Sequence, residues 1–428
     1  MENTYKISSI IDSYISGDWG NDCTTDDTPY PVYCVRGADI VPISNSQFND
    51  IPLRYVSKRS FQTRCLQEGD IIIEKSGGSP TQSTGRVVYV SKELLSAKKN
   101  IVCSNFCTAF RVKEGWNAHY VFLYLQNVYN SGVFFNFEGK TSGLKNLMID
   151  AAFKSIPIKK IPIAKQTDLA DSISAIDKKL SLNRQINDNL EAMAKLLYDY
   201  WFVQFDFPNE EGKPYKSSGG AMVWNEKLKR EIPSSFEVVN MGKLCDFRNG
   251  INYSKDETGN DYQIVNVRNI SSSRILLDGE DFDVITVPTS KAGNYVLKPD
   301  DIIIARSGCP GSTRLLLSPA NTLFCGFIIC CSPNDSRMRN YLVYCLKQLE
   351  GTNATTSGGS ILQNVSQDTL KGLHVIVPEK QIIDKFNKTI ELIFARMLNC
   401  LKESKALTKQ RNELLPLLMN GQATVNSD

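Results

Sequence analysis

Two acidic side chains and a lysine stand close together near residue 70 and could take part in metal chemistry. Asp70 is followed by Glu74 and Lys75, and paired acids beside a lysine can hold Mg²⁺. A later stretch repeats this neighbourhood but has Ala305 and Arg306 in place of Glu74 and Lys75. The features common to both copies are those of a strand entering a turn, so we expect no catalysis here.

Other catalytic signatures are missing from the sequence. It contains no Gly-x-x-x-x-Gly-Lys-Ser/Thr phosphate loop and no Asn-Pro-Pro-Tyr or Asp-Pro-Pro-Tyr motif, the signature of amino-methyltransferases. His119 and His374 are the only histidines, which leaves almost no material for triads or histidine-based metal sites. The 12 cysteines include no Cys-x-x-Cys pair, so we expect them to be reduced and mostly buried. We therefore expect a chain without a catalytic residue, metal or cofactor of its own.

Two glycine-rich loops with basic ends carry residue types that contact nucleic acids. Glycines let backbone N–H groups approach a phosphate, and flanking Lys or Arg side chains supply charge. Gln, Ser, Thr and Arg can also contact base edges. An exposed connection between two strands prefers the same residue types, so that alternative stays open. The candidate DNA-contacting residues in these loops are Lys75, Ser76, Gly77, Gly78, Thr81, Gln82 and Arg86, then Arg306, Ser307, Gly308, Ser312 and Arg314.

A second pair of small polar loops precedes Pro162 and Pro378 by similar distances. Their hydroxyl and N–H groups could contact phosphates, or they could form a helix cap or turn. Both alternatives stay open. The candidate DNA-contacting residues in these loops are Ser142, Lys145, Ser357 and Gly358.

These loops belong to a sequence pattern that occurs twice along the chain. Residues 67–78 (Gln-Glu-Gly-Asp-Ile-Ile-Ile-Glu-Lys-Ser-Gly-Gly) reappear as residues 298–309 (Lys-Pro-Asp-Asp-Ile-Ile-Ile-Ala-Arg-Ser-Gly-Cys), 231 residues later. The dipeptide Val35-Arg36 also reappears, as Val267-Arg268. Each of these arginines could stabilise a nearby carboxylate or reach DNA. A repeat of this length indicates two similar domains rather than a solenoid.

Each half ends in a long segment with a heptad pattern and no glycine, over residues 168–202 and 383–418. We expect two long helices, about 50 Å for the first, that pair in the antiparallel direction. Pro416 should end or kink the second helix. Asn183 and Asn187 make the first seam polar, either to control register or because the seam is open to water there. Candidate residues of the coiled-coil or partner-subunit interface are Ile173, Ile176, Leu180, Leu190, Leu197, Trp201, Phe202, Ile390, Ile393, Met397, Leu407 and Leu414.

The expected fold class is mixed α/β, with two similar globular domains separated by the two long helices. Aromatic residues crowd the end of the first helix, where we expect core or interface anchors rather than stacking on nucleic acid. No apolar run is long enough to span a membrane, and a formal net charge of +3 is close to neutral. The expected parts are a first domain (1–160), a first helix (161–205), a polar linker (206–235), a second domain (236–376), a second helix (377–421) and a tail (422–428).

The sequence resembles the DNA-specificity subunit of type I restriction–modification systems. The strongest signals are residues 182–191 (Leu-Asn-Arg-Gln-Ile-Asn-Asp-Asn-Leu-Glu), residues 196–202 (Leu-Leu-Tyr-Asp-Tyr-Trp-Phe), Phe-Asp-Phe-Pro at 205–208 and Gly-Lys-Pro-Tyr-Lys-Ser-Ser-Gly-Gly at 212–220. The duplicated Asp-Ile-Ile-Ile…Ser-Gly element also matches. The resemblance covers essentially the whole chain.

This resemblance implies that each domain is a target recognition domain reading half of a split, asymmetric site in double-stranded DNA, and that the coiled coil sets the gap. Two copies of a modification subunit would methylate adenines with S-adenosylmethionine. Restriction subunits, with ATP and Mg²⁺, would complete the nuclease. The chain itself would be non-catalytic and located in a bacterial or archaeal cytoplasm. The alternatives are a recognition module of another methyltransferase system and a coiled-coil scaffold without DNA binding.

Overall fold

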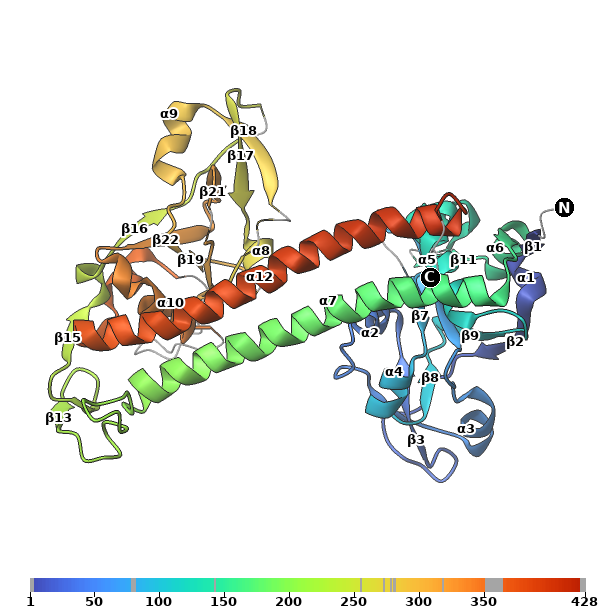
Figure 1. Cartoon of the computed structure of the whole chain (residues 1–428), viewed down its shortest axis with the longest axis horizontal. Helices are drawn as coiled ribbons and strands as arrows, with labels where there is room; N and C mark the ends of the chain where they lie inside the picture. Colours follow the sequence, from blue (N-terminus) through green and yellow to red (C-terminus); the bar gives the residue numbers. More distant parts are fainter. Residues whose placement is uncertain are drawn as a thin grey trace. The chain divides into compact units, whose positions relative to one another are not determined.

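The computed structural model of the protein divides into two compact units. Unit 1 comprises Met1–Leu182 with Ser404–Asp428, and unit 2 comprises Asn183–Glu403. The boundary cuts both long helices, so each unit holds one α/β domain and part of each helix (Figure 1). The described residues are 4–77, 82–141, 144–254, 256–271, 274–277, 279, 282–317, 319–350 and 365–423.

The main sheet of unit 1 is antiparallel, with the strand order β2-β9-β5-β7. In a smaller sheet, β4-β3-β8, strand β3 runs antiparallel to β4 and parallel to β8. The pairings β10-β11-β6 and β1-β12 complete the strands of this unit's described residues. The strands span Thr4–Lys6 (β1), Ile11–Ser16 (β2), Tyr30–Val35 (β3), Leu53–Val56 (β4), Ile71–Glu74 (β5), Ser76–Gly77 (β6), Val87–Tyr89 (β7), Ile101–Cys103 (β8), Cys107–Val112 (β9), Glu138–Thr141 (β10), Leu144–Leu147 (β11) and Pro157–Lys159 (β12).

Helix α5 spans Ala118–Asn130 and packs on the domain of unit 1. It begins after Asn117, whose side chain accepts a hydrogen bond from the N–H of Tyr120. Its apolar face, including Val121 and Leu125, is buried in the core of unit 1. The helices of this domain span Ile7–Ile10 (α1), Ile40–Ser44 (α2), Lys58–Arg64 (α3), Lys92–Ala97 (α4), Ala118–Asn130 (α5) and Ile149–Ser155 (α6).

Unit 2 builds its main antiparallel sheet in the order β16-β22-β19-β20, and a smaller sheet in the order β18-β17-β21. Strand β17 runs antiparallel to β18 and parallel to β21. The pairs β13-β14 and β15-β23 are also antiparallel. The elements span Met222–Asn225 (β13), Arg230–Pro233 (β14), Glu237–Asn240 (β15), Cys245–Asn249 (β16), Asn260–Val265 (β17), Val267–Ser271 (α8), Asp283–Val287 (β18), Thr289–Ala292 (α9), Ile302–Ala305 (β19), Thr313–Leu315 (β20), Thr322–Phe324 (β21), Ile328–Pro333 (β22), Arg339–Lys347 (α10), Gln367–Gly372 (α11) and His374–Val377 (β23).

The two domains therefore share one topology, as the sequence repeat predicts. Strands β5 and β19, which carry the repeated Ile-Ile-Ile, are completely buried in the two main sheets. The two runs pair with the neighbouring strand in the same register. The first isoleucine of each run pairs with an equivalent residue, Ile71 with Phe110 of β9 and Ile302 with Cys331 of β22. Ile73 pairs with Val87, so the first glycine-rich loop connects two neighbouring strands.

One predicted match between the copies is wrong by two residues. Val35 ends β3 beside the last residue of β8, and Val265 ends β17 beside the last residue of β21, so the two valines are equivalent. Arg36 then corresponds to Asn266, whereas Arg268 lies two residues further along. Strand register is set by pairing with distant segments, and a short local echo does not contain that information.

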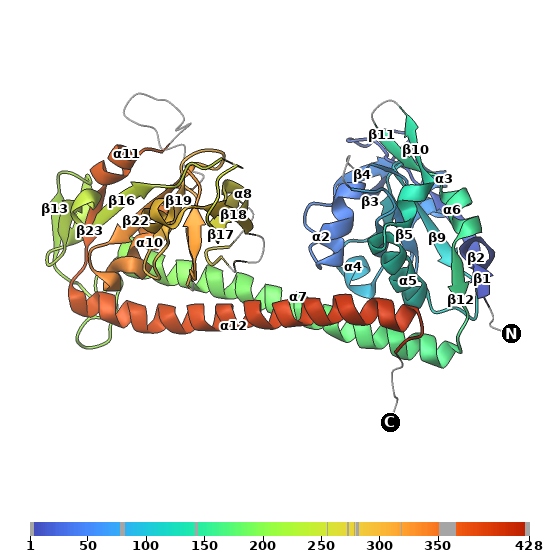
Figure 2. The same cartoon turned by 90° about the horizontal axis from the view of Figure 1, so that it is seen from above.

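The long helices begin after each domain. Helix α7 spans Ile163–Tyr198 and continues as a π-helical turn, Asp199–Val203 (Figure 2). Helix α12 spans Lys380–Met419. The sequence predicts that Pro416 ends or kinks this helix. An end at Pro416 is wrong, because Pro416 lies inside the helix, which continues to Met419. Pro416 stands in the last turn, so the lost N–H donor and the crowding by its ring affect only the end of the helix.

Within unit 1, the two helices pack antiparallel. Arg411 of α12 donates to Asp177 of α7 at 2.5 Å. Ile173, one turn earlier on α7, shares a core cluster with Leu415, one turn later on α12. The heptad seam thus buries apolar residues of both helices against each other and the domain.

Within unit 2, the pairing is antiparallel as well. Tyr198 lies against Phe386, with 6.4 Å between ring centroids, and the earlier Asn183 donates to the later Glu403 at 2.9 Å. Asn183 and Asn187 are 1% and 2% exposed, so the alternative of a seam open to water is wrong at these positions. The Oδ1 atom of Asn187 has no hydrogen-bond partner among the described residues.

The segment predicted as a polar linker contains a β-hairpin, β13-β14. Before the hairpin, Phe207 stacks on Phe236 with 5.1 Å between ring centroids, and both rings are buried in the core of unit 2. Trp201, Phe202 and Phe205 are buried in the same core, whereas Tyr200 is 39% exposed, so the aromatic cluster at the end of α7 is mostly core, as expected. The glycines and prolines of this segment form turns around a packed element rather than a flexible connection.

The 12 cysteines are all free, and most are buried, as expected. Burial raises the pKa of the Cys34 and Cys107 thiols to about 12, so they remain protonated at neutral pH. Within the described ranges, no helix is long and apolar enough to cross a membrane.

Candidate functional site

A buried aspartate organises the same turn in both domains. Asp70 and Asp301 immediately precede β5 and β19 and are 0% and 4% exposed. Asp70 accepts a hydrogen bond from the N–H of Gln67 at 2.8 Å, and Asp301 accepts one from the N–H of Lys298 at 2.8 Å. Each carboxylate therefore closes the turn that leads into the buried strand, which explains why aspartate occurs in both copies.

The arginine that neutralises this aspartate comes from a different strand in each domain. In unit 1, Arg111 on β9 donates to both carboxylate oxygens of Asp70, at 2.7 and 3.0 Å. In unit 2, Arg248 on β16 donates to Asp301 at 2.6 Å, while Ser332 occupies the place of Arg111. The described residues contain no group of three or more His, Cys, Asp or Glu that could hold a metal ion. The geometry thus favours a structural role for the acid that the sequence marked as a possible Mg²⁺ ligand.

The second acid of that possible metal site is also paired with an arginine. Arg86 donates to the two carboxylate oxygens of Glu74 at 2.9 and 2.5 Å, and the Glu74 side chain is 2% exposed. The hydrogen bond to Glu74 raises the pKa of Arg86. The N–H of Glu74 donates to the carbonyl of Arg86, as that of Ala305 donates to Ser312. The structural counterpart of Arg86 is therefore Ser312, and not Arg314.

The structure brings the two predicted loops of unit 1 together. Ser76 and Gly77 form β6, which pairs with β11 of the hairpin β10-β11. Lys145 on this hairpin donates to the carbonyl of Gln82 at 3.3 Å and lies 3.2 Å from a carboxylate oxygen of Glu138. From the sequence, these loops are two separate candidates. Because β6 pairs with β11, the two loops lie side by side and form one surface.

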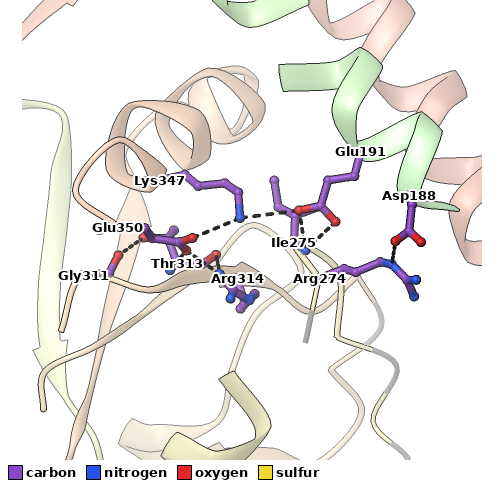
Figure 3. Close-up of polar contacts among 9 residues, drawn as sticks. All are labelled: Asp188, Glu191, Arg274, Ile275, Gly311, Thr313, Arg314, Lys347 and Glu350. Atoms are coloured by element: carbon purple, nitrogen blue, oxygen red, sulfur yellow. Dashed lines mark hydrogen bonds and ion pairs between the residues drawn. The ribbon is translucent and has the colours of Figure 1, made fainter. Parts of the chain in front are cut away.

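In unit 2, Arg314 is 6% exposed on β20 and its guanidinium is paired with Glu350. Figure 3 shows the connected network, in which Glu350 also lies 3.2 Å from Lys347. Lys347 lies 3.5 Å from Glu191 of α7, which accepts hydrogen bonds from the N–H of Ile275 at 3.2 and 3.3 Å. This network connects the domain of unit 2 to its part of α7, which favours a supporting role for Arg314.

The remaining loop candidates of unit 2 follow β19 directly. Arg306 is exposed, Ser307 is half-buried, and Gly308 adopts a φ of 79°, which favours glycine. Contact with DNA stays a prediction for the whole candidate set. Five of its members lie outside the described residues: Gly78, Thr81, Ser142, Ser357 and Gly358.

Sequence reasoning missed one exposed aromatic residue in each domain. Phe106, between β8 and β9, is 54% exposed, and Phe327, between β21 and β22, is 64% exposed. The carbonyl of Phe106 accepts a hydrogen bond from the N–H of Lys75 at 2.8 Å, and that of Phe327 accepts one from Arg306 at 2.8 Å. The signal in the sequence was a phenylalanine just before the strand that pairs with each Ile-Ile-Ile run. The backbone of each phenylalanine therefore lies next to the backbone of a residue predicted to contact DNA.

The predicted helix-interface residues lie on the seams that the chain itself covers. Met193, Leu196 and Leu392 are instead 49%, 67% and 70% exposed on the helices of unit 2. Contact of the seam with a partner subunit stays a prediction. The seam candidates are buried at Ile173, Leu180, Trp201, Phe202, Ile390, Ile393 and Met397, and half-buried at Ile176, Leu190, Leu197, Leu407 and Leu414.

Comparison with known proteins covers both domains. A family model for the type I restriction modification DNA specificity domain matches residues 39–192 and 233–415. The type I restriction enzyme MjaIX specificity subunit of Methanocaldococcus jannaschii is 22% identical over 407 residues, covering 91% of this chain and 88% of that protein. The HindI specificity subunit of Haemophilus influenzae is 25% identical over 427 residues, covering 84% and 87%. A crystal structure of the type I restriction–modification S subunit from M. genitalium has the same fold, with a TM-score of 0.57 at 15% identity, covering 100% of this chain and 97% of that chain.

Proposed function

This chain belongs to the family of type I restriction modification DNA specificity domains, and we propose that each of its two α/β domains reads one half of a split DNA sequence. The observation that supports this proposal most strongly is that the two domains have the same main sheet. The sheets β2-β9-β5-β7 and β16-β22-β19-β20 have the same order and strand directions, whereas the loops between their strands differ in sequence. Two domains with the same sheets but different loops would bind two different half-sites, and the combined DNA target would be asymmetric.

In this proposal, α7 and α12 fix the number of base pairs between the two half-sites. An α-helix has a constant rise of about 1.5 Å per residue, so a pair of helices can act as a spacer of defined length. The antiparallel packing within each unit supports this role. Deleting matched segments from both helices should shorten the gap and leave the half-sites unchanged. An unchanged gap would remove the spacer role.

The chemical steps would belong to partner subunits. Two copies of a modification subunit would methylate adenines with S-adenosylmethionine, and restriction subunits would use ATP and Mg²⁺ for cleavage. The pairing of Asp70 and Glu74 with arginines supports this division of roles, because it fits a structural role for both acids. Leu196 and Leu392, both exposed on helices, offer apolar contacts for a protein partner. A net charge of +3 also fits DNA binding that is shared with other subunits.

The test is coexpression with a candidate modification subunit, followed by mapping of methylated adenines by single-molecule sequencing. We expect one split, asymmetric sequence. Replacing residues 1–150 by the equivalent part of a relative should change one half-site, and replacing 236–376 should change the other. If either replacement changed both halves, independent reading would be wrong. A complex that forms but methylates without sequence preference would favour the scaffold alternative.

A further inference from the structure

The turns that carry Phe106 and Phe327 are the same structure built twice. The N–H of Ser104 donates to the carbonyl of Val35 at 2.9 Å, and the N–H of Cys325 donates to that of Val265 at 3.0 Å. In each case a second hydrogen bond of 2.9 Å closes the turn across the phenylalanine. Each ring is therefore held by a hydrogen-bonded backbone, and not by a loose loop.

A glycine lies against each turn and permits this packing. A Cβ atom on Gly17 would collide with the carbonyl of Ser104, and one on Gly250 would collide with the carbonyl of Cys325. Because the backbone of the glycine lies so close to that of the turn, the position of the turn and of its phenylalanine is fixed. The side chains of the turn differ between the copies, with Asn105 in one and Gly326 in the other, whereas the phenylalanine is the same.

A basic residue is hydrogen-bonded through its backbone to each phenylalanine. Lys75 and Arg306 are exposed, and their N–H groups are bonded to the carbonyls of the two phenylalanines. Among the described residues, neither cation forms an ion pair with a carboxylate. A single exposed phenylalanine is ordinary on a protein surface. An exposed phenylalanine whose backbone is bonded to that of an exposed basic residue, at equivalent positions of two otherwise divergent domains, points to a shared binding role.

We propose that Phe106 and Phe327 contact DNA, one in each recognition domain, through packing of the ring on the apolar surface of the duplex beside a phosphate held by Lys75 or Arg306. Lys and Arg bind phosphates, and apolar side chains pack on thymine methyl groups or on base steps. Because each domain has a phenylalanine and a basic residue at these equivalent positions, the pair anchors each domain on its half-site, and the divergent loops discriminate the bases. This inference rests on the proposed function, since it requires that the domains bind DNA.

The test uses the full chain, copurified with its modification subunit, and a duplex oligonucleotide containing the mapped target. Fluorescence anisotropy would measure the affinity of Phe106→Ala, Phe327→Ala and the double variant. We expect each single substitution to weaken binding about 5- to 100-fold, as for aromatic residues that contact bases. Phe106→Tyr and Phe327→Tyr should recover most of the affinity. Tyr14→Ala, which removes a 49% exposed aromatic residue on β2, is the matched control and should bind as the unchanged protein does.

The outcomes separate the two levels of the proposal. If the unchanged complex prefers its target over a scrambled duplex and both alanine variants bind equally well, the role of the rings is refuted and the proposed function stands. Variants that keep DNA affinity but lose the modification subunit during copurification would assign the rings to a protein interface and refute the DNA contact. If the unchanged complex shows no sequence preference, the proposed function itself fails. Matching thermal unfolding of variants and unchanged protein would show that the fold is intact.

Discussion

The substitution Arg86→Ala separates a structural role of this arginine from DNA contact. It leaves the Glu74 carboxylate buried at 2% exposure without either of its two hydrogen bonds from the guanidinium. Removing one partner of a buried ion pair costs about 3–5 kcal/mol, because the remaining charge is desolvated and unpaired. Local opening of the sheet around β5 and β7 should therefore become about 100- to 4000-fold more frequent.

The second domain supplies the matched compensating variant. Ala305 and Ser312 stand at the positions of Glu74 and Arg86, so the double substitution Glu74→Ala/Arg86→Ser copies a pair that this fold already contains. Removing both charges leaves no unpaired group, and we expect the double variant to recover most of the stability lost in Arg86→Ala. The coupling between the two positions should exceed about 1 kcal/mol.

Amide hydrogen exchange measured by mass spectrometry suits this prediction, because it reports local opening strand by strand in a chain made of two compact units. Peptides from Ile71–Glu74 and Val87–Tyr89 should lose protection in Arg86→Ala, while peptides from Ile302–Ala305 in unit 2 serve as the internal reference. Unchanged exchange in β5 and β7, together with a loss of DNA affinity, would refute the reasoning and identify Arg86 as a DNA contact.

Three further predictions concern unit stability, measured by hydrogen exchange or denaturant unfolding. Asn187→Leu should stabilise the helix pair of unit 2 by about 1–2 kcal/mol, because it removes a buried oxygen that has no hydrogen-bond partner among the described residues. Asn183→Leu should instead destabilise the pair, because it removes the hydrogen bond that Asn183 donates to Glu403 across the two helices. Equal effects of the two substitutions would contradict this. Arg411→Ala should weaken helix packing in unit 1 by about 1–3 kcal/mol, with a smaller loss in Arg411→Lys; no change would mean that the contact is not formed. Burial lowers the pKa of His119, so the unfolded chain takes up a proton that the folded one resists; unit 1 should lose stability as pH falls below the ordinary value of 6.5, and His119→Gln should remove that dependence.

The periodic features of the fold could be predicted from the sequence. Ile71–Ile73 and Ile302–Ile304 were identifiable as buried strands because each is a short apolar run before a glycine-rich turn. The helix seams followed from a heptad pattern, which depends on local spacing alone. The buried positions Ile173 and Phe386 confirm that pattern.

Features that depend on contacts between distant segments could not be predicted. The hairpin at Met222–Pro233 stands among glycines, prolines and charged residues that indicate a linker. Whether Arg86 or Arg314 lies near an acid depends on strand register, which a loop sequence does not specify. Phe106 and Phe327 gave no periodic signal, and their shared place became visible only through the backbone hydrogen bonds of Lys75 and Arg306.

The arginine that pairs with the buried aspartate lies on β9 in the first domain and on β16 in the second. This difference limits where the coding sequences of the two domains can recombine. A crossover that joined β2 of the first copy to β22 of the second would put Ile15 where Arg248 stands and keep Ser332, leaving Asp301 with no guanidinium. The reciprocal crossover would combine Arg248 with Arg111 around one carboxylate. Both products carry an unbalanced buried charge. Viable exchange of recognition modules between relatives should therefore have its breakpoints outside the main sheet, so that each domain is inherited whole.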